Sequence, residues 1–226
     1  MIGVFLTDSI PFGTYTGVCM NDLTCPVPKN ENTERIFHEA WELFQARGYR
    51  GASMDELCRR CGITKPTLYY YFKDKETLYL HVVLRQLQGF RAVMKSDASL
   101  TDRLIRLATM VLSGFDASIS AMMHDMTHIK EPSYHQAIGQ AFQDELLDPL
   151  TAAIRQAMEA GSLRQGDPDF FAWAFLGLVN TFIGRKQGTE AEPESLALRL
   201  VALFLEGAQQ TVRQETIPQG ASRPRE

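Results

Sequence analysis

Hydroxyl groups, phenol rings and lysines that suit contact with double-stranded DNA are gathered between residues 64 and 75. Lysine ammonium groups and the hydroxyls of threonine and tyrosine donate hydrogen bonds to phosphate oxygens and to base edges. Residues 47–75 carry seven Lys or Arg against three Asp or Glu, whereas the whole chain of 226 residues has a formal net charge of −4. This local positive charge is the electrostatic pattern that DNA binding requires.

Two short helices joined by a turn are predicted to position these side chains. Ser53 is suited to cap the first helix, and the apolar residues of 54–61 recur at helical spacing. Gly62 can end that helix in the left-handed conformation. Thr64 can cap the second helix, whose first turn tolerates Pro66. The pattern therefore predicts a helix-turn-helix, braced by a preceding helix over residues 32–47 that Gly48 ends.

The stretch GYRGASMDELCRRCGITKPTLYYYFKDKETL resembles the DNA-binding signature of the tetracycline-repressor (TetR/AcrR) family of transcription factors. The resemblance covers roughly residues 33–80. It implies a repressor that binds a palindromic operator as a homodimer and is released by a small, largely apolar effector. Half-site centres of such a dimer lie about 34–36 Å apart, or a multiple of one helical turn.

The matching positions imply particular DNA contacts. Base edges and groove walls are expected to meet Lys65, Thr67, Tyr69 and Tyr71, and phosphates are expected to meet Ser53, Thr64, Tyr70 and Lys75. Thr33 begins the preceding helix and either binds a phosphate or caps that helix. Leu68 and Phe72 should face inward and hold the second helix in place. Asp55 departs from relatives that carry a guanine-reading Arg near this point; it either accepts a hydrogen bond from a cytosine amino group or complements the helix N-terminus.

The fold class is predicted to be all-α, with an N-terminal three-helix helix-turn-helix DNA-binding domain and a C-terminal helical ligand-binding and dimerisation domain. Residues 1–28 contain no Lys or Arg and are predicted to be a disordered leader. The DNA-binding domain is expected to span 29–76, the effector-binding and dimerisation domain 77–215, and a disordered tail 216–226. Helices in the second domain are predicted over about 75–94, 100–112, 117–129, 142–160, 168–186 and 193–213.

Apolar side chains of the second domain suggest two uses besides ordinary core packing. Methionine and aromatic rings could line an effector pocket, and the candidates are Met110, Phe115, Met122, Met126, Phe142 and Trp173. The resemblance implies that the helices over 142–160 and 168–186 pair with their copies in a dimer, with interface candidates Leu150, Ile154, Phe171, Phe175, Leu178 and Phe182.

Two pairs of residues could support functions of other classes. Cys58 and Cys61 form a Cys-x-x-Cys pair, which suits either packing between helices or a redox-sensing regulator. His124 and His128 lie one helical turn apart, which suits either a polar helix face or a metal-dependent enzyme. The sequence shows no nucleophile–base pair, no phosphate-cradling glycine loop and no complete metal set, so we expect no enzyme activity and no cofactor.

Composition sets the remaining limits. No apolar run approaches the roughly 20 residues that span a bilayer, so we expect no membrane association. Four cysteines in 226 residues favour a reducing, cytoplasmic setting over a disulfide framework. The expected partners are double-stranded DNA, a small-molecule effector and a second copy of the chain.

Overall fold

The computed structural model describes residues 30–115, 119–184 and 192–209, and all the regular structure in these ranges is helical. The all-α fold class is therefore confirmed. The elements are α1 Glu31–Gly51, α2 Met54–Cys61, α3 Lys65–Tyr71, α4 Lys75–Met94, α5 Leu100–Gly114, α6 Ile119–Met126, α7 Pro132–Phe142, η1 Gln143–Leu147, α8 Asp148–Glu159, α9 Pro168–Asn180 and α10 Pro193–Gln209. The leader over 1–28 and the tail over 216–226 lie outside the described residues.

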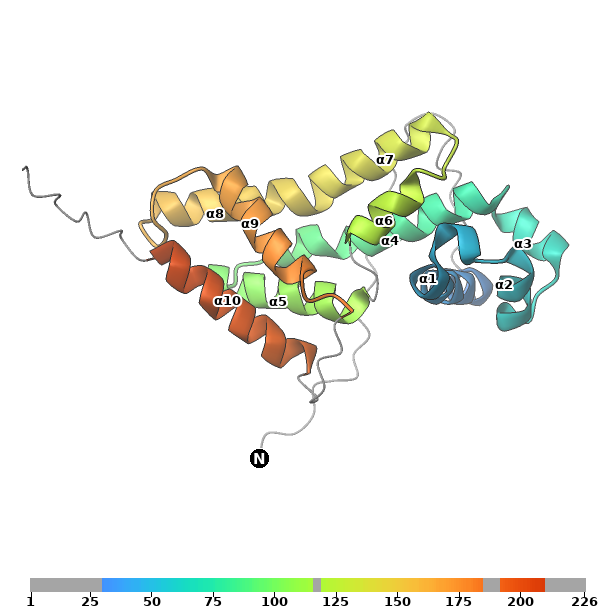
Figure 1. Ribbon diagram of the computed structural model, residues 1–226, viewed down its shortest axis with the longest axis horizontal. Helices are drawn as coiled ribbons and strands as arrows, with labels where there is room; N and C mark the ends of the chain where they lie inside the picture. Colours follow the sequence, from blue (N-terminus) through green and yellow to red (C-terminus); the bar gives the residue numbers. More distant parts are fainter. Residues whose placement is uncertain (1–29, 116–118, 185–191, 210–226) are drawn as a thin grey trace, which may run out of the picture.

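Helix α4 runs from the α1–α3 head into the body of the molecule (Figure 1). Every residue from Leu78 to Leu84 is buried, so this part of α4 is covered on all sides. A helical stretch that is covered on all sides belongs in the interior, and residues 78–84 of α4 take that position. Its first turn is closed by Asp74, whose carboxylate accepts the Thr77 N–H at 2.8 Å. Helix α3 thus leads, within three residues, into the central helix of the fold.

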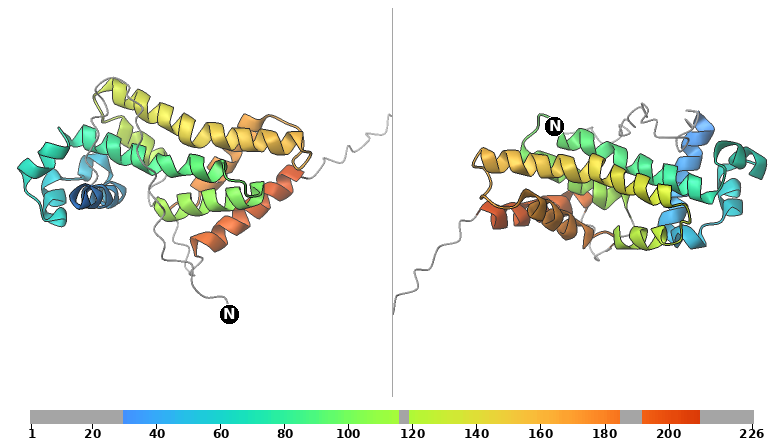
Figure 2. Two further views of the ribbon diagram at one scale, coloured as in Figure 1. Left: turned by 180° about the vertical axis from the view of Figure 1, so that it is seen from behind. Right: turned by 90° about the horizontal axis from the view of Figure 1, so that it is seen from above.

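The body packs around α4 and α5. Helices α7, η1 and α8 form one continuous helical run beside α4 (Figure 2). Helix α5 packs against α10, and α8 packs against α9. The helix predicted over 142–160 therefore begins earlier, at Pro132, whose ring is tolerated in the first helical turn. Among the described residues, no helix is long and apolar enough to cross a membrane.

Gly48 interrupts α1 with a backbone that other residues rarely adopt. Its φ of 67° and ψ of 172° lie outside the helical region. The break frees the Tyr49 N–H, which donates to Asp125 Oδ2 of α6 at 2.8 Å. A Cβ atom at position 48 would lie 3.1 Å from Asp125 Oδ1. The sequence-based expectation that Gly48 ends the first helical run is confirmed.

Gly48→Ala is expected to destabilise the fold by about 2–4 kcal/mol, because it combines backbone strain with crowding of the Asp125 hydrogen bond. Gly62→Ala is the matched control. Gly62 is also left-handed, with φ of 64°, but a Cβ there meets nothing within 4 Å. Gly62→Ala is expected to lower the free energy of unfolding by about 1–2 kcal/mol. Urea denaturation measures both, and equal losses for the two variants would contradict a role for the Asp125 contact.

Candidate nucleic-acid interface

Side-chain caps fix the two helices of the helix-turn-helix. Ser53 Oγ accepts the Asp55 N–H at 3.2 Å at the start of α2. Gly62 ends α2 in the left-handed conformation. Thr64 Oγ1 accepts the Thr67 N–H at 3.4 Å, and the two threonine hydroxyls lie 2.8 Å apart. These local contacts set the turn that orients α3 relative to α2.

The recognition helix α3 separates anchoring side chains from displayed ones. Leu68 and the Phe72 that follows the helix are fully buried, as the sequence predicts. Tyr70 is 81% exposed and Tyr69 is 46% exposed. Tyr71 is half-buried, and its hydroxyl accepts a hydrogen bond from Asn30 Nδ2 at 3.4 Å. Exposure of an apolar tyrosine ring to water is unfavourable. The two exposed tyrosines therefore suggest that α3 is a contact surface.

Lys65 begins the exposed side of α3 and is already paired. Its ammonium lies 2.6 Å from Asp55 Oδ1 of α2, and both side chains remain more than half exposed. Thr67 lies two residues, about half a turn, further along and is half-buried. Lys65, Thr67 and Tyr69 thus lie on the short helix from which base contacts were expected. Asp55 of α2 lies beside Lys65.

Lys75 differs from the exposed phosphate-binding group that the sequence suggests. Its ammonium donates to the carbonyl oxygen of Ala52 at 2.5 Å and to that of Arg50 at 3.4 Å. It also lies over the Tyr49 ring, 4.7 Å from the ring centre. Desolvation by these neighbours lowers the pKa of Lys75. The side chain therefore holds the segment leading into α2, and a phosphate would compete with the carbonyls for the same ammonium.

Thr33 is buried in a capping box. Its hydroxyl donates to the Asn30 carbonyl oxygen at 2.9 Å, and the Asn30 side chain accepts the Thr33 N–H at 2.9 Å. Only 1% of Thr33 is exposed. Of the two roles considered for Thr33, capping is the one that this geometry supports.

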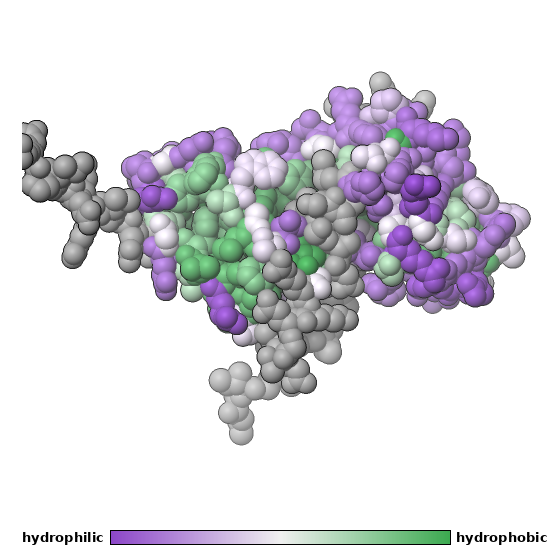
Figure 3. All heavy atoms as spheres, viewed as in Figure 1, coloured by the Kyte–Doolittle hydropathy of each residue, from purple (hydrophilic) through white to green (hydrophobic). Residues whose placement is uncertain are grey.

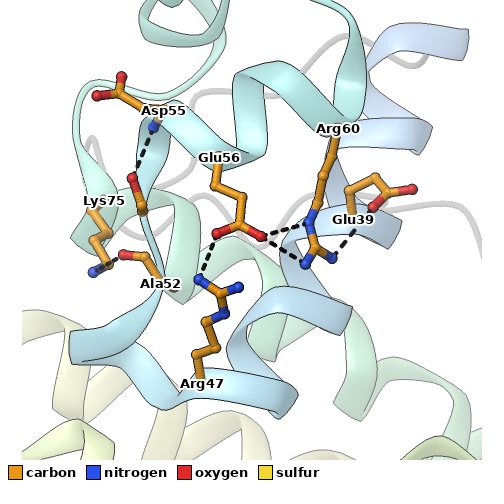
Figure 4. A network of polar contacts seen from close by, with 8 residues as sticks. Glu39, Arg47, Ala52, Asp55, Glu56, Arg60 and Lys75 are labelled. Carbon is orange, nitrogen blue, oxygen red and sulfur yellow. Dashed lines mark hydrogen bonds and ion pairs between the residues drawn. The ribbon is translucent and has the colours of Figure 1, made fainter.

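An ion-pair network locks α2 against α1 (Figure 4). Glu56 accepts from Arg47 Nη1 at 2.6 Å and from Arg60 Nη2 at 2.9 Å, and Arg60 Nη1 lies 3.9 Å from Glu39 Oε2. The hydrogen bond from Arg60, helped by the positive charge of Arg47, lowers the pKa of Glu56. Two of the seven cations counted in the positive segment are thus used to hold the helices together.

The cysteine pair has the surroundings of core residues. Cys58 and Cys61 are both buried and free. Burial raises the pKa of both thiols, that of Cys61 to about 11. A redox sensor needs an accessible thiolate, so burial weakens that alternative.

The histidine pair lies on α6 and in the turn after it. The His124 and His128 rings are 5.3 Å apart, edge to face. Within the described residues, no three His, Cys, Asp or Glu side chains form a group that could hold a metal ion. Asp125, between them in sequence, instead accepts a hydrogen bond from the Tyr49 N–H of α1.

The six pocket candidates fall in different parts of the body. Phe115 packs edge-on against Trp41, with ring centres 5.2 Å apart, and stacks on Phe90 at 6.3 Å. Phe142 and Trp173 form a separate aromatic pair with ring centres 5.9 Å apart. Met110, Met122 and Met126 are partly buried and pack against the core. The proposed pocket lining is therefore not a single aromatic cluster.

Four of the six interface candidates belong to the core of one chain. Leu150, Ile154, Phe171 and Phe175 are at most 5% exposed in the single chain. Leu150 and Ile154 of α8 and Phe171 and Phe175 of α9 thus face the interior of the single chain, and their role in a dimer interface stays a prediction. Leu178 and Phe182 remain partly exposed.

The exposed apolar face lies on α9 and α10 instead. Figure 3 shows apolar residues gathered over these helices, at the end of the molecule away from α1–α3. The large exposed members are Phe170, Trp173, Leu198 and Leu203. The sequence could not single them out, because α9 and α10 carry apolar residues on more than one side.

Two contacts between the head and the body were missed by sequence reasoning. Trp41 Nε1 of α1 donates to the Gly114 carbonyl oxygen at the end of α5, at 3.0 Å. Asp125 of α6 accepts the Tyr49 N–H, across 76 residues of sequence. The sequence around Trp41 and Asp125 would also fit residues on the surface, so no local pattern predicts these two contacts.

Comparison with known proteins matches the head to one family. Residues 36–82 match the model for bacterial regulatory proteins of the tetR family. The HTH-type transcriptional activator FasR of Mycolicibacterium smegmatis is 36% identical over 91 residues, which cover 40% of this chain and 42% of FasR. The chain thus spans less than half the length of this curated relative.

Solved structures share the fold over most of the chain. A tetR-family regulatory protein from Rhodococcus RHA1 has a TM-score of 0.66 and 21% identity, covering 80% of this chain and 98% of that one. AibR, crystallised with isovaleryl coenzyme A and operator DNA, has a TM-score of 0.62 and 24% identity, covering 76% and 97%. At these identities the likeness establishes the arrangement of helices.

A buried histidine links the stability of the head to pH. His81 of α4 packs edge-on against Phe72, with ring centres 5.9 Å apart, and burial lowers its pKa below the ordinary value of 6.5. The unfolded chain therefore binds a proton more readily than the folded chain. The contribution of neutral His81 is fully present above the unfolded pKa and is lost as pH falls below it.

The free energy of unfolding is accordingly expected to drop between pH 7.5 and pH 5.5, and His81→Leu is expected to lessen that drop. Urea denaturation at the two pH values measures the difference. His38→Leu is the control, since it removes an exposed histidine from α1, a helix that packs against α4. If the free energy of unfolding falls equally in wild type and His81→Leu between pH 7.5 and pH 5.5, other groups cause the fall.

Proposed function

The chain belongs to the TetR family of bacterial regulatory proteins, and we propose that it is a ligand-responsive transcriptional repressor. In this proposal residues 29–76 bind DNA, while residues 77–215 bind an effector and join two copies of the chain. The observation that carries the DNA-binding function is the recognition helix, which buries Leu68 and displays Tyr69 and Tyr70. Proteins of this family are transcription regulators, so no enzyme activity is proposed.

The displayed face of the head supplies the proposed contacts. Lys65, Thr67 and Tyr69 are placed to meet base edges or groove walls, with Tyr71 at the margin because its hydroxyl is bonded to Asn30. Ser53, Thr64 and Tyr70 carry exposed hydroxyls that can donate to phosphates. Lys75 supports the Ser53 segment through the Ala52 carbonyl, so its contribution to phosphate binding is proposed to be largely indirect.

A homodimer follows from the small size of each head. Helix α3 has seven residues, too few for tight specific binding by one copy. A two-fold dimer presents two such helices to a palindromic site, with half-sites about 34–36 Å apart or a multiple of a turn.

The proposed interface is the exposed apolar face of α9 and α10. Along α9, the exposed residues Phe170, Trp173, Ala174 and Gly177 recur at helical spacing, and the small ones permit close approach of a second helix. Aromatic and aliphatic residues without charge are typical of interface cores. Burying this face also removes Leu198 and Leu203 from water.

Effector control is proposed to work through the contacts between body and head. A ligand among the apolar side chains of the body would favour a conformation in which α4 shifts, and the two heads would no longer match the groove spacing. The ligand can act only as far as it binds that conformation more tightly. The Asp125–Tyr49 hydrogen bond and the Trp41–Gly114 hydrogen bond are the contacts that such a shift would strain. Isovaleryl coenzyme A, the ligand of AibR, suggests acyl thioesters as first probes.

Selection of bound duplexes from a random pool tests the DNA-binding function. The expected result is an inverted repeat whose affinity falls steeply with salt. Tyr70→Ala should weaken binding by about tenfold while leaving the free energy of unfolding within about 0.5 kcal/mol, since the side chain is exposed. Leu68→Ala, the buried control, should destabilise the head by about 2–5 kcal/mol. A wild-type chain that enriches no duplex at moderate salt would refute the proposal.

The selected duplex then tests effector control. Isovaleryl coenzyme A and longer acyl-CoA thioesters are titrated into the protein–DNA complex, with free coenzyme A as the control. An effective thioester should release the DNA, whereas coenzyme A should not. A thioester that binds the protein and leaves its affinity for DNA unchanged would refute the regulatory mechanism and leave DNA binding intact.

Ala174→Glu tests the dimer. Placing a carboxylate at the centre of the α9 face would bury an unpaired charge in each copy, which costs about 3–5 kcal/mol. The dimer dissociation constant should rise at least 100-fold, measured by sedimentation equilibrium, and binding to the inverted repeat should weaken with it. Gln136→Glu, on the exposed side of α7, adds the same charge elsewhere and should change neither. An unchanged dimer in Ala174→Glu would move the interface to another face.

A further inference from the structure

A carboxylate stands on the face of the head that is proposed to meet DNA. Asp55 lies in the first turn of α2, and its side chain points away from Glu56 and the ion-pair network behind it (Figure 4). Its Oδ1 atom lies 2.6 Å from Lys65 Nζ at the start of α3. The Asp55 side chain is 66% exposed and that of Lys65 is 58% exposed, so the pair faces solvent.

The electrostatic balance makes this arrangement unusual for a surface that only holds phosphates. Asp55 repels the DNA backbone and engages the first cation of the recognition helix. An exposed ion pair contributes little to stability, typically about 0–1 kcal/mol. The small gain in stability therefore gives little reason for a carboxylate at this position, and a role of the pair in binding explains it better.

The pair retains hydrogen-bonding capacity on both members. An ammonium has three donors, and one is directed at Asp55, so two remain. A carboxylate has two oxygens with about four acceptor sites, and Lys65 uses one of them. Asp55 and Lys65 together present two donors beside an acceptor, held in that order by the 2.6 Å contact before any ligand arrives.

The major groove offers the complementary order at one kind of base pair. A G·C pair presents two acceptors, N7 and O6 of guanine, followed by the N4 amino donor of cytosine. An A·T pair presents an acceptor, a donor and an acceptor, so one thymine or adenine acceptor would face the carboxylate. Two donors and an acceptor side by side therefore fit G·C, and they fit it in one orientation.

We propose that Asp55 and Lys65 act as one unit that reads a single G·C base pair in each half-site, with Lys65 donating to guanine and Asp55 accepting from cytosine. Because the two side chains are already paired, less side-chain freedom is lost on binding. The inference rests on the proposed DNA-binding function and adds a specificity-determining role for Asp55.

The test measures base preference at every position of the selected duplex. Wild type, Asp55→Ala, Lys65→Ala and the double variant are compared by equilibrium binding to duplexes that carry each single base-pair change. Glu42→Gln, on the exposed side of α1, is the control for loss of one negative charge from the head. Thermal unfolding checks that each variant folds, and Asp55→Asn replaces Asp55→Ala if the alanine variant does not.

The expected result is local. Asp55→Ala and Lys65→Ala should each reduce discrimination at the same single base pair by about 10- to 100-fold. The double variant should lose little more than either single variant, because the two residues act together. Glu42→Gln should leave the preference at every position unchanged.

Three results would overturn the inference. Asp55→Ala could strengthen binding to all duplexes alike and keep every base preference, which would make Asp55 a general repulsive charge. The two single variants could change preference at different base pairs, which would separate their roles. The shared position could prove to be A·T in wild type, which would contradict the donor–acceptor order. Failure of the wild type to bind any duplex is a distinct outcome and would refute the proposed function itself.

Discussion

The packing of Phe72 is the contact on which the head depends. This ring follows the recognition helix directly, is fully buried, and meets Phe37 of α1 and His81 of α4 edge-on at 5.5 Å and 5.9 Å. One side chain thus ties three helices together at the point where α3 gives way to α4. Since α3 has seven residues, it cannot hold its own orientation, and the direction of its displayed tyrosines is set by this packing.

The position of α4 makes the head and the body mechanically dependent. The stretch of α4 from Leu78 to Leu84 is buried on every side, so α4 cannot shift without changing its contacts with α1, α5 and the α7–α8 run. The Gly48 break adds a second connection, because it turns the Tyr49 N–H toward Asp125 of α6. A backbone N–H released from a helix needs another acceptor, and here the body supplies it. The geometry of the head is therefore sensitive to the position of α6.

Local signals explain what the sequence could predict. The caps at Ser53 and Thr64, the glycine stops at 48 and 62, and the inward Leu68 depend on neighbours a few residues away, and all are found where the pattern places them. The acceptor for the Lys75 ammonium lies 23 positions away in sequence, and the acceptor for the Tyr49 N–H lies 76 positions away. The exposed side of α9 depends on which face α8 and α10 cover. Periodicity identifies an apolar face but does not say whether the same chain or another buries it.

Lys65 and Lys75 show why residue type alone does not define a DNA contact. Both lie in the positive segment, and both have their ammonium groups occupied in the free chain. Lys75 is half-buried and donates to the carbonyl oxygens of Arg50 and Ala52, so in the proposed interface it acts through the segment that it holds. Lys65 is exposed and paired with the likewise exposed carboxylate of Asp55. In the proposed interface the partner of each lysine therefore distinguishes its role: Lys75, bonded to the backbone, supports a segment, and Lys65, bonded to an exposed side chain, reads a base.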